Sequence, residues 1–386
     1  MGAGAVYVHI PFCTNKCYYC DFNSYVHKGQ PVEDYLDALF REMELTVAEE
    51  PPGEIASVFI GGGTPTVLTP EQLARLLTAI RHYFPKWKAD CEVTVEANPG
   101  TVDREKLAAL REGGVNRLSI GAQSFDASML KRLGRIHRPE DTLRSVELAR
   151  RAGFENLSID LMFGLPDQTM EQFQDTLRQA LALRLPHYSI YSLIIEENTP
   201  YYTWYHQGRL ALPGEDEELA MYLTAIEEMQ KAGYHHYEIS NFCRPGMASR
   251  HNLTYWRNEE YYGLGAGAHG FLNQCRYENI REIGPYIQRL RLGQRPVRHS
   301  HKVSRQEAME DFMMLGLRLR DGVEWERFRE RFRVSIREVF PDVLDDLEKE
   351  GLIEVDRRGI RLSRQGLLFG NEVFASFLSL GESAAT

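Results

Sequence analysis

The sequence lacks long apolar runs, since no stretch approaches the roughly 18 consecutive apolar residues that a membrane-spanning helix needs. Its start, MGAGAVYVHIPF, also lacks the basic stretch and the cleavable apolar segment of a secretory signal. Gly2 is followed by Val6 where a myristoylation signal requires Ser or Thr. We therefore expect a cytoplasmic protein with no transmembrane segment and no lipid anchor.

A long basic run is missing as well. The chain has 45 Lys and Arg against 55 Asp and Glu, a formal net charge of -10 at pH 7. This balance disfavours phosphate binding and argues against nucleic acid as the main partner. With 43% hydrophobic and 26% charged residues, the composition is typical of a globular protein rather than a disordered, collagen-like or coiled-coil chain. A chain of 386 residues is long enough for two or three domains.

The cysteines do not have the spacing of a disulfide framework. Three of the six fall within eight residues, at Cys13, Cys17 and Cys20. The other three are scattered and are expected to be ordinary core residues: Cys91, Cys243 and Cys275. In a reducing compartment, clustered thiols predict a metal site or a redox pair, because a short loop holds thiolates on one side of a single ion or cluster.

The first 240 residues alternate short β-branched runs with longer helical patterns, which predicts repeated βα units around a parallel sheet. Thr69-Pro70-Glu71-Gln72 has the form of a capping box, and Thr101-Val102-Asp103 opens another helix. We expect seven strands, at Val6–Ile10, Ser57–Ile60, Glu92–Glu96, Arg117–Ile120, Asn156–Met162, His187–Ile195 and His236–Ile239.

The pattern changes near residue 300, after a polar stretch rich in Gly and Pro. Ser304-Arg305-Gln306-Glu307 then opens a helix with a capping box, and a hairpin is expected around Arg357-Arg358-Gly359. We therefore divide the chain into a core, residues 1–300, and a helical, winged-helix-like C-terminal domain, residues 301–386. The latter has 14 Lys and Arg against 17 Asp and Glu, so we expect it to pack or to act as a lid rather than to bind DNA.

The three clustered cysteines form a CxxxCxxC loop directly after the first predicted strand. A structural zinc site usually needs four protein ligands, and no second paired cysteine motif exists to complete one. Three thiolates can instead bind three irons of a [4Fe–4S] cluster. The fourth iron would then be open to a ligand that is not part of the protein.

Polar residues recur where the predicted strands end. Gly61-Gly62-Gly63-Thr64-Pro65-Thr66 follows the second strand, Glu96 ends the third, Gln123 follows the fourth, and Asp160 lies within the apolar fifth. A carboxylate in such a strand is costly unless it has a partner. Since the carboxyl ends of parallel strands meet at one rim, these segments are expected to converge with the cysteine loop.

The CxxxCxxC loop, with an aromatic residue at Tyr19 before its last cysteine, resembles the radical S-adenosylmethionine (radical SAM) superfamily. The resemblance implies a partial (β/α) barrel of about six parallel strands, with Cys13, Cys17 and Cys20 as cluster ligands. It also implies that the open iron binds the amino and carboxylate groups of SAM, and that an electron from the cluster cleaves SAM to a 5′-deoxyadenosyl radical. The chemistry would thus belong to the cofactors, and the protein would position them.

By motif, the resemblance extends to the oxygen-independent coproporphyrinogen oxidase-like branch and implies a set of SAM contacts. The glycine loop is expected to meet the amino group through its backbone, Arg135 to meet a carboxylate, and Asp160 or Gln123 to accept from ribose hydroxyls. The implied SAM-binding residues are Tyr7, Tyr19, Gly62, Gly63, Thr64, Glu96, Gln123, Arg135 and Asp160.

Within that branch, three motifs resemble the heme chaperone family HemW. They are Gly121–Phe125, Ile159–Pro166 and His251-Asn252-Leu253-Thr254-Tyr255-Trp256. One position separates the two relatives: the oxidase carries a further cysteine two residues after the third, and here that residue is Phe22. The resemblance therefore implies a chaperone that binds heme and delivers it to recipient hemoproteins, with respiratory hemoproteins among the candidates. If a recipient is a membrane enzyme, weak peripheral association of the chaperone with the membrane is expected. Oxidative decarboxylation of coproporphyrinogen III stays the alternative, and a radical SAM enzyme for an unrelated substrate is a third.

The motif at His251 predicts the heme site. An imidazole ligates heme iron well, and Tyr255 and Trp256 would lie against the porphyrin face. His269 is a second candidate ligand. Three arginines are expected to meet the propionates: Arg244, Arg250 and Arg257. On the residues alone, a packed and hydrogen-bonded histidine is the alternative interpretation.

Gly265-Ala266-Gly267-Ala268-His269-Gly270 also fits the dinucleotide-binding pattern G-x-G-x-x-G. That pattern requires a strand before it and a helix after it. We expect neither, since Glu259-Glu260-Tyr261-Tyr262 precedes the glycines and a strand-like segment follows. We therefore interpret these residues as a glycine-rich strand near the active face.

Overall fold

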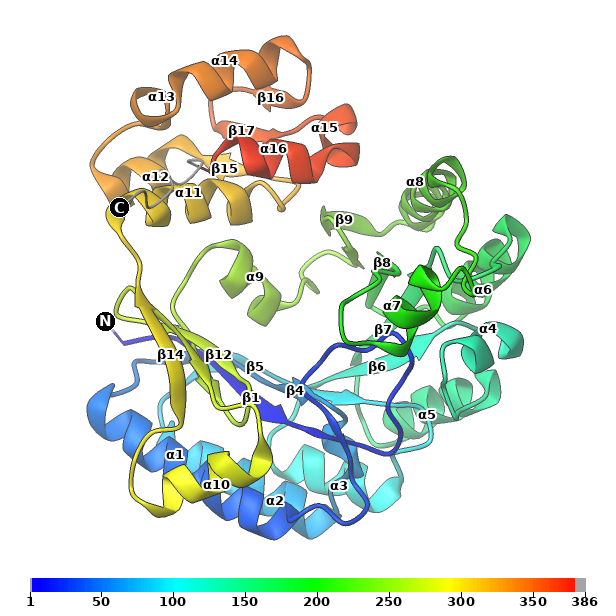
Figure 1. The fold of residues 1–386 in the computed structure, drawn as a ribbon, viewed down its shortest axis with the longest axis vertical. Coiled ribbons are helices and arrows are strands. Elements are labelled where there is room, and N and C mark those ends of the chain that lie inside the picture. Colours follow the sequence, from blue (N-terminus) through cyan, green and yellow to red (C-terminus); the bar gives the residue numbers. More distant parts are fainter. Residues whose placement is uncertain (1, 379–386) are drawn as a thin grey trace.

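The computed structural model describes residues 2–378 and is built around one large open sheet (Figure 1). Its nine strands lie in the order β11-β1-β4-β5-β6-β7-β8-β10-β9. The seven from β11 to β8 are mutually parallel, whereas β10 is antiparallel to both of its neighbours. The bounds are β1 Ala5–Ile10, β4 Ile55–Gly62, β5 Trp87–Ala97, β6 Arg117–Gln123, β7 Asn156–Phe163, β8 His187–Ser192, β9 His235–Glu238, β10 Asn241–Cys243 and β11 Tyr262–Leu264.

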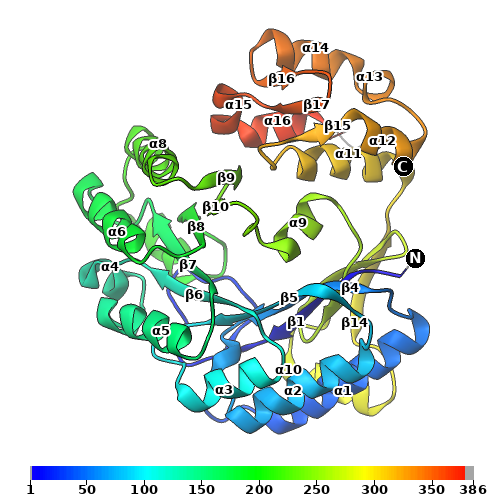
Figure 2. The same cartoon turned by 180° about the vertical axis from the view of Figure 1, so that it is seen from behind.

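Helices follow the parallel strands and cover the convex face of the sheet (Figures 1 and 2). Their bounds are α1 Val32–Glu49, α2 Pro70–Tyr83, α3 Arg104–Glu112, α4 Ala127–Arg132, α5 Pro139–Arg151, α6 Met170–Ala182 and α8 Glu215–Lys231. α7, Pro200–His206, packs against the cysteine loop instead, where the Tyr201 amide donates to the Tyr18 carbonyl at 3.0 Å. The capping box at Thr69 opens α2, and Asp103 caps α3. The predicted helix starts are confirmed, because these short side chains satisfy amides that the first helical turn leaves free.

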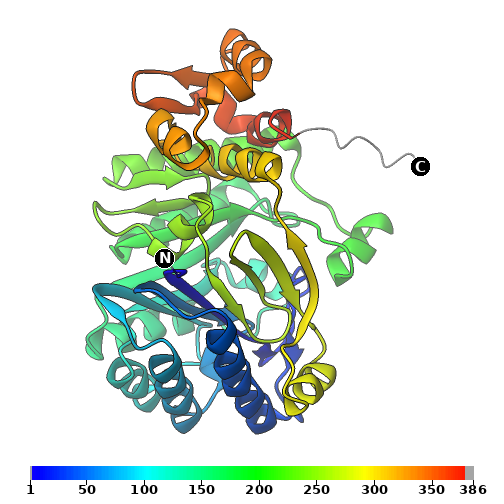
Figure 3. The same ribbon diagram turned by 90° about the vertical axis from the view of Figure 1, so that its left-hand side faces the viewer.

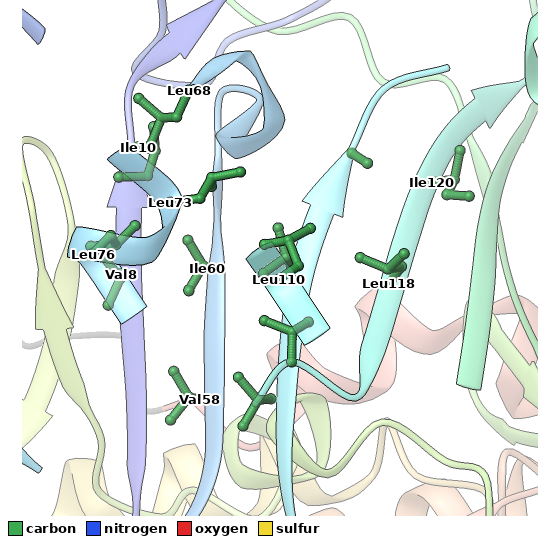
Figure 4. Close-up of a cluster of buried hydrophobic side chains, with 14 of the residues drawn as sticks. Val8, Ile10, Val58, Ile60, Leu68, Leu73, Leu76, Leu110, Leu118 and Ile120 are labelled. Atoms are coloured by element: carbon green, nitrogen blue, oxygen red, sulfur yellow. The ribbon is translucent and has the colours of Figure 1, made fainter. Parts of the chain in front are cut away.

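The core under the helices consists of aliphatic side chains from the sheet and from the helices that cover it (Figure 4). Val8, Val58 and Leu118 come from three strands, while Leu76 and Leu110 come from α2 and α3, and none is measurably exposed. Because successive strand residues point to opposite faces, their neighbours along each strand point to the concave side. The sheet therefore has an apolar convex face and a concave face on which polar side chains can lie.

The concave face carries a short helix and a small second sheet. α9, Arg250–Trp256, lies across the concave side, between the sheet and the C-terminal elements (Figures 1 and 2). The second sheet contains β12 His269–Leu272, β13 Cys275–Asn279 and β14 Val297–Lys302, and α10, Ile283–Arg291, packs on α1. The small pair β2 Phe12–Cys13 and β3 Tyr25–Val26 flanks the cysteine loop.

The C-terminal elements form a layer beyond α9 with their own apolar cluster (Figure 3). Their three-stranded sheet has the order β15-β17-β16, and the expected hairpin is β16 and β17. The bounds are α11 Arg305–Gly316, β15 Val323–Glu324, α12 Trp325–Phe332, α13 Ile336–Val339, α14 Pro341–Lys349, β16 Ile353–Val355, β17 Gly359–Leu362, α15 Arg364–Leu368 and α16 Gly370–Ser376. The boundary near residue 300 stays a prediction.

The fold class is confirmed, because six of the predicted strands pair in parallel in chain order and the sheet does not close. Two expectations about the edges were wrong. A strand, β11, does precede the glycines of residues 265–270, and Gly265 and Gly267 lie in the turn between β11 and β12 rather than in a strand, whereas Gly270 belongs to β12. β12, not a helix, follows them, so the dinucleotide pattern still fails. Cys275 is half-buried on β13 rather than in the core.

Among residues 2–378, no helix is long and apolar enough to cross a membrane, as the absence of long apolar runs predicts.

Candidate cofactor site

The cysteine loop is fixed to the sheet by its backbone. Cys13 lies on β2 just beyond the end of β1, and its carbonyl accepts from the His27 amide at 2.8 Å. Further along the loop, the Tyr18 amide donates to the Leu133 carbonyl at 3.1 Å, and the Cys20 amide closes a turn onto the Cys17 carbonyl at 3.3 Å. The loop therefore holds its thiols over the carboxyl ends of the parallel strands.

The three sulfur-bearing side chains line one cavity of about 320 Å³. Burial raises the pKa of Cys20 to about 11 and raises that of Cys13 as well, so a bound cation must displace protons from them. Within residues 2–378, no three His, Cys, Asp or Glu side chains are arranged to hold a single metal ion. A structural zinc site usually has four protein ligands, whereas the three thiols at this cavity match the number that leaves one iron of a [4Fe–4S] cluster open.

Most of the SAM-binding residues expected from the sequence line the cavity. Seven of the nine expected SAM-binding residues line it: Tyr19, Gly62, Gly63, Glu96, Gln123, Arg135 and Asp160. Thr64 lies behind the wall, where its hydroxyl donates to Cys13 Sγ at 3.6 Å. Tyr7 lies on the concave face of β1, its hydroxyl 2.9 Å from His9 Nδ1 and its ring stacked on Phe59. In this structure both residues support the wall rather than face the cavity.

The glycine loop is shaped by close contacts within the protein. Gly62 has φ +106°, and a Cβ there would lie 2.3 Å from the His9 ring. Its amide donates to Glu96 Oε2 at 3.0 Å, and the amides of Gly63 and Thr64 donate to backbone carbonyls. Since an amino group is a donor, a ligand's amino group would have to meet carbonyl oxygens of this loop.

Glu96 and Asp160 are two half-buried carboxyl groups that line the cavity from β5 and β7, the strands on either side of β6. Burial, together with the nearby charge of Asp160, raises the pKa of Glu96 to about 7. Burial raises the pKa of Asp160 to about 6, opposed by the charge of Arg117 and by the Ser119 hydroxyl, which donates to Oδ1 at 3.3 Å. Such shifts are common where carboxyl groups serve ligands.

Arg135 is a half-buried cation without an anionic partner. Its Nη2 donates to the Tyr19 hydroxyl at 2.9 Å and its Nη1 to Asn98 Oδ1 at 2.7 Å, while its buried Nε has no acceptor. No carboxylate of the described residues forms an ion pair with it. A half-buried charge that meets only neutral partners fits a site for an anionic ligand group.

Gln123 lies at an irregular end of its strand. The register between β6 and β7 shifts after Ile120, and Gln123 has φ +64°, which is uncommon for a residue with a side chain. Its Oε1 accepts from the Tyr191 hydroxyl at 2.9 Å. Non-glycine residues in this region often lie at ligand sites, and the bulge turns this amide into the cavity.

Sequence reasoning missed several wall residues. The main ones are Asn98, Ser119, Tyr191, Ser192, Ile194 and Glu196. Asn98 follows Glu96 at the end of β5, so the strand-end rule could have found it. Tyr191 lies near the end of β8, and nothing in an aromatic strand residue distinguishes a cavity wall from a core.

The second expected site is closed. His251 lies on α9 with no measurable exposure, its Nδ1 3.0 Å from Ser57 Oγ and its Nε2 2.8 Å from the Tyr255 hydroxyl. Burial lowers the pKa of His251 to about 3, so the ring is neutral. The role of His251 as heme ligand stays a prediction. In this conformation, however, neither nitrogen is free for iron, and ligation would require α9 to move.

The other residues of the expected heme site point in different directions. His269, at the start of β12, is exposed. The arginines are dispersed: Arg250 pairs with Asp90, Arg244 lies over the Tyr234 ring, and Arg257 is exposed. The structure therefore does not bring these groups into one pocket with His251.

Comparison with known proteins agrees with this geometry. The Radical SAM superfamily profile matches residues 7–180, and the HemN C-terminal domain profile matches residues 303–369. The chain is 46% identical to the heme chaperone HemW of Bacillus subtilis, over 97% of this chain and 99% of that protein. It is 43% identical to HemW of Escherichia coli, over 69% of each. The solved coproporphyrinogen III oxidase HemN of Escherichia coli superimposes with a TM-score of 0.84 and 25% identity, over 97% and 90% of the two chains.

The sheet, the cysteine loop and these matches define a radical SAM protein. That class implies a [4Fe–4S] cluster and SAM, and the three thiols and the unpaired Arg135 fit this pair. Within the class, the chain belongs to the HemW family.

Proposed function

We propose that this protein is a heme chaperone, which binds heme and transfers it to recipient hemoproteins on a radical SAM scaffold. The observation that carries the proposal is the 46% identity to the Bacillus subtilis heme chaperone over 97% of the chain. An identity of this extent includes the cysteine loop, the concave face and the C-terminal elements. It therefore concerns the whole molecule rather than the common scaffold alone.

The residues of the cavity define how the cofactors would be held. Cys13, Cys17 and Cys20 would bind three irons, and the amino and carboxylate groups of SAM would bind the fourth. When bound, this pair supplies one-electron reductive cleavage of SAM. The chain's own contribution is to hold the thiols on a fixed loop and to bury the reacting centre among Tyr19, Met162 and Tyr191.

The remaining wall residues would orient SAM. The Arg135 guanidinium, already held by Tyr19 and Asn98, would offer its unused charge to a carboxylate. Carbonyl oxygens of the glycine loop would accept from the amino group. Asp160 and Gln123 would accept from the ribose hydroxyls, since both have side-chain oxygens at the cavity.

Phe22 favours the chaperone over the oxidase. It lines the cavity at the position where the oxidase carries its further cysteine, and its ring is 61% exposed. A phenyl ring cannot replace a thiol in proton or electron transfer. Coproporphyrinogen oxidation stays the second candidate because the fold of the Escherichia coli oxidase covers 97% of this chain.

The recipients and the location extend the proposal. We propose that the protein works in the cytoplasm, and that respiratory hemoproteins are among its recipients. Delivery to a membrane enzyme requires only a transient approach to the bilayer surface. Weak peripheral association would be enough for this purpose.

One experiment separates the two candidates. Protein reconstituted without oxygen is given heme and, in parallel, SAM, a reductant and coproporphyrinogen III. We expect a Soret change on heme addition, transfer of that heme to an apo-hemoprotein, and no protoporphyrinogen. Formation of protoporphyrinogen would refute the chaperone proposal, and so would the absence of both heme binding and transfer.

A further inference from the structure

Exposed large hydrophobic side chains line the cofactor cavity and the recess beside it. Such clusters are rare on soluble proteins and mark interaction sites. Phe22 and Ile194 both line the cavity although 172 residues separate them in sequence, and Ile136 lines an adjoining recess beside Cys17. Five exposed hydrophobic residues lie on the cysteine loop, on β3 and on the loops around it: Tyr18, Phe22, Val26, Ile136 and Ile194.

The exposure of Phe22 does not come from a loose loop. The next residue, Asn23, donates through Nδ2 to the carbonyls of Ala266 and Arg281, both at 2.9 Å. Ser24 beyond it is buried, and the Cys20 amide bonds the Cys17 carbonyl before it. The backbone is therefore held on both sides of Phe22, while the ring itself points to solvent at 61% exposure.

Ile194 is likewise held in place by its neighbours. Leu193 and Ile195 belong to a small apolar cluster with Leu165 and Tyr201, and Leu193 is only 8% exposed. Ile194 between them is 66% exposed. The Tyr201 amide also donates to the Tyr18 carbonyl at 3.0 Å, which joins this side of the mouth to the cysteine loop. The two exposed side chains thus stand on one connected, rigid frame.

We propose that heme docks across the mouth of the cofactor cavity, with its apolar ring on Phe22 and Ile194. This inference rests on the proposed chaperone function and names the site that function would use. The cavity, about 320 Å³, must already hold the cluster and SAM, so a macrocycle has to lie over the opening rather than inside it. Apolar side chains on a fixed frame present such a ring with a surface that needs no ordering on binding.

The charges at the mouth give the bound heme an orientation. Lys16 lines the cavity and forms no ion pair with any residue from 2 to 378; its ammonium donates a long hydrogen bond of 3.4 Å to the Ser24 carbonyl, so its charge has no anionic partner and is available to a propionate. Asp21 and Glu196 line the same opening and would repel a propionate. The propionate edge therefore faces Lys16. Docking here leaves His251 and α9 in place, unlike ligation by His251.

The test compares matched exposed residues in heme titrations of the reconstituted full-length protein. Phe22→Ser and Ile194→Ser each remove apolar surface at the mouth, and the pair of changes should weaken heme binding at least about tenfold. Phe22→Leu keeps an apolar side chain and should retain binding. The control is Leu292→Ser, since Leu292 is 68% exposed at the end of α10, and it should bind heme within about twofold of the unmodified protein. Iron content is measured on every variant.

The outcomes separate this site from the proposed function. If the unmodified protein binds no heme, the chaperone proposal fails, and the site falls with it. If the double variant with Phe22→Ser and Ile194→Ser binds heme as tightly as the unmodified protein, the proposed docking site is wrong, while the chaperone function stands. Equal weakening by Leu292→Ser would show nonspecific adsorption and would also overturn the site. If Phe22→Ser loses iron, the docking site is tested by the heme affinity of Ile194→Ser alone, because Ile194 lies outside the cysteine loop.

Discussion

The cofactor cavity and the region around α9 were both expected to bind a ligand, and the structure gives them opposite characters. The cavity walls contain unsatisfied groups: Arg135 has a charge without a counter-ion, and its buried Nε has no acceptor. Around α9, both nitrogens of His251 are engaged. In a ligand-binding site, some polar groups lack partners while the ligand is absent. A network in which every polar group has a partner mainly stabilises the fold.

The largest effect expected from this contrast is the loss of iron in Cys17→Ser. A serine hydroxyl is a poor ligand for iron in a cluster, and only three protein thiols are available. We expect iron to fall from about four per chain to below one after anaerobic reconstitution, measured by iron and sulfide analysis.

The matched control is Cys275→Ser, since Cys275 is half-buried on β13, away from the cavity. Its iron content should equal that of the unmodified protein. Full iron in Cys17→Ser, or a single zinc ion in place of iron, would remove the cofactor assignment of the cavity.

The closed region is tested by stability. His251→Ala removes a buried ring and leaves the Ser57 hydroxyl and the Tyr255 hydroxyl without their partner. Lost packing and unpaired groups should lower the free energy of unfolding by about 2–4 kcal/mol. Denaturant unfolding of the cofactor-free protein measures this. SAM affinity should change by less than about twofold.

His269→Ala is the control, because His269 is exposed and its removal should change the unfolding midpoint little. A tenfold loss of SAM affinity in His251→Ala would show that the two regions act as one site. In that case the contrast between an open and a closed region would not hold.

The sequence predicted the cofactor site better than the α9 site for a physical reason. Cys13, Glu96 and Asp160 occupy ends or interiors of parallel strands, and parallel strands place their carboxyl ends on one rim. Topology therefore determines that these residues meet. His251 lies on a seven-residue helix in an irregular segment, and its orientation depends on tertiary contacts with Ser57 and Glu92 that no local pattern encodes.

The same reasoning explains the errors at the edges of the sheet. β11 has only three residues, and its pairing with β1 joins segments about 255 residues apart. Such a strand has no periodicity long enough to recognise. Thr64 follows a strand end and Tyr7 was expected from the family resemblance, yet Thr64 bonds Cys13 and Tyr7 bonds His9. Whether a rim residue faces the ligand or supports its neighbour is decided by packing.

The smallest expected effect is a pH dependence of SAM affinity, and it distinguishes the two regions by charge. Asp160, with its pKa raised to about 6 by burial, is ionised above that pH and accepts hydrogen bonds best in that form. SAM affinity should therefore fall about fourfold through Asp160 as the pH drops from 7.5 to 5.5, and Asp160→Asn should remove this part of the profile. Glu96, with its pKa raised to about 7, titrates in the same pH range, so the profile of Glu96→Gln shows how much of the pH dependence of SAM affinity comes from Glu96. His251, with its pKa lowered to about 3, stays neutral over this pH range. If the pH profile of SAM affinity changed in His251→Ala but not in Asp160→Asn, the region around α9, and not the cavity, would be the ligand-binding region.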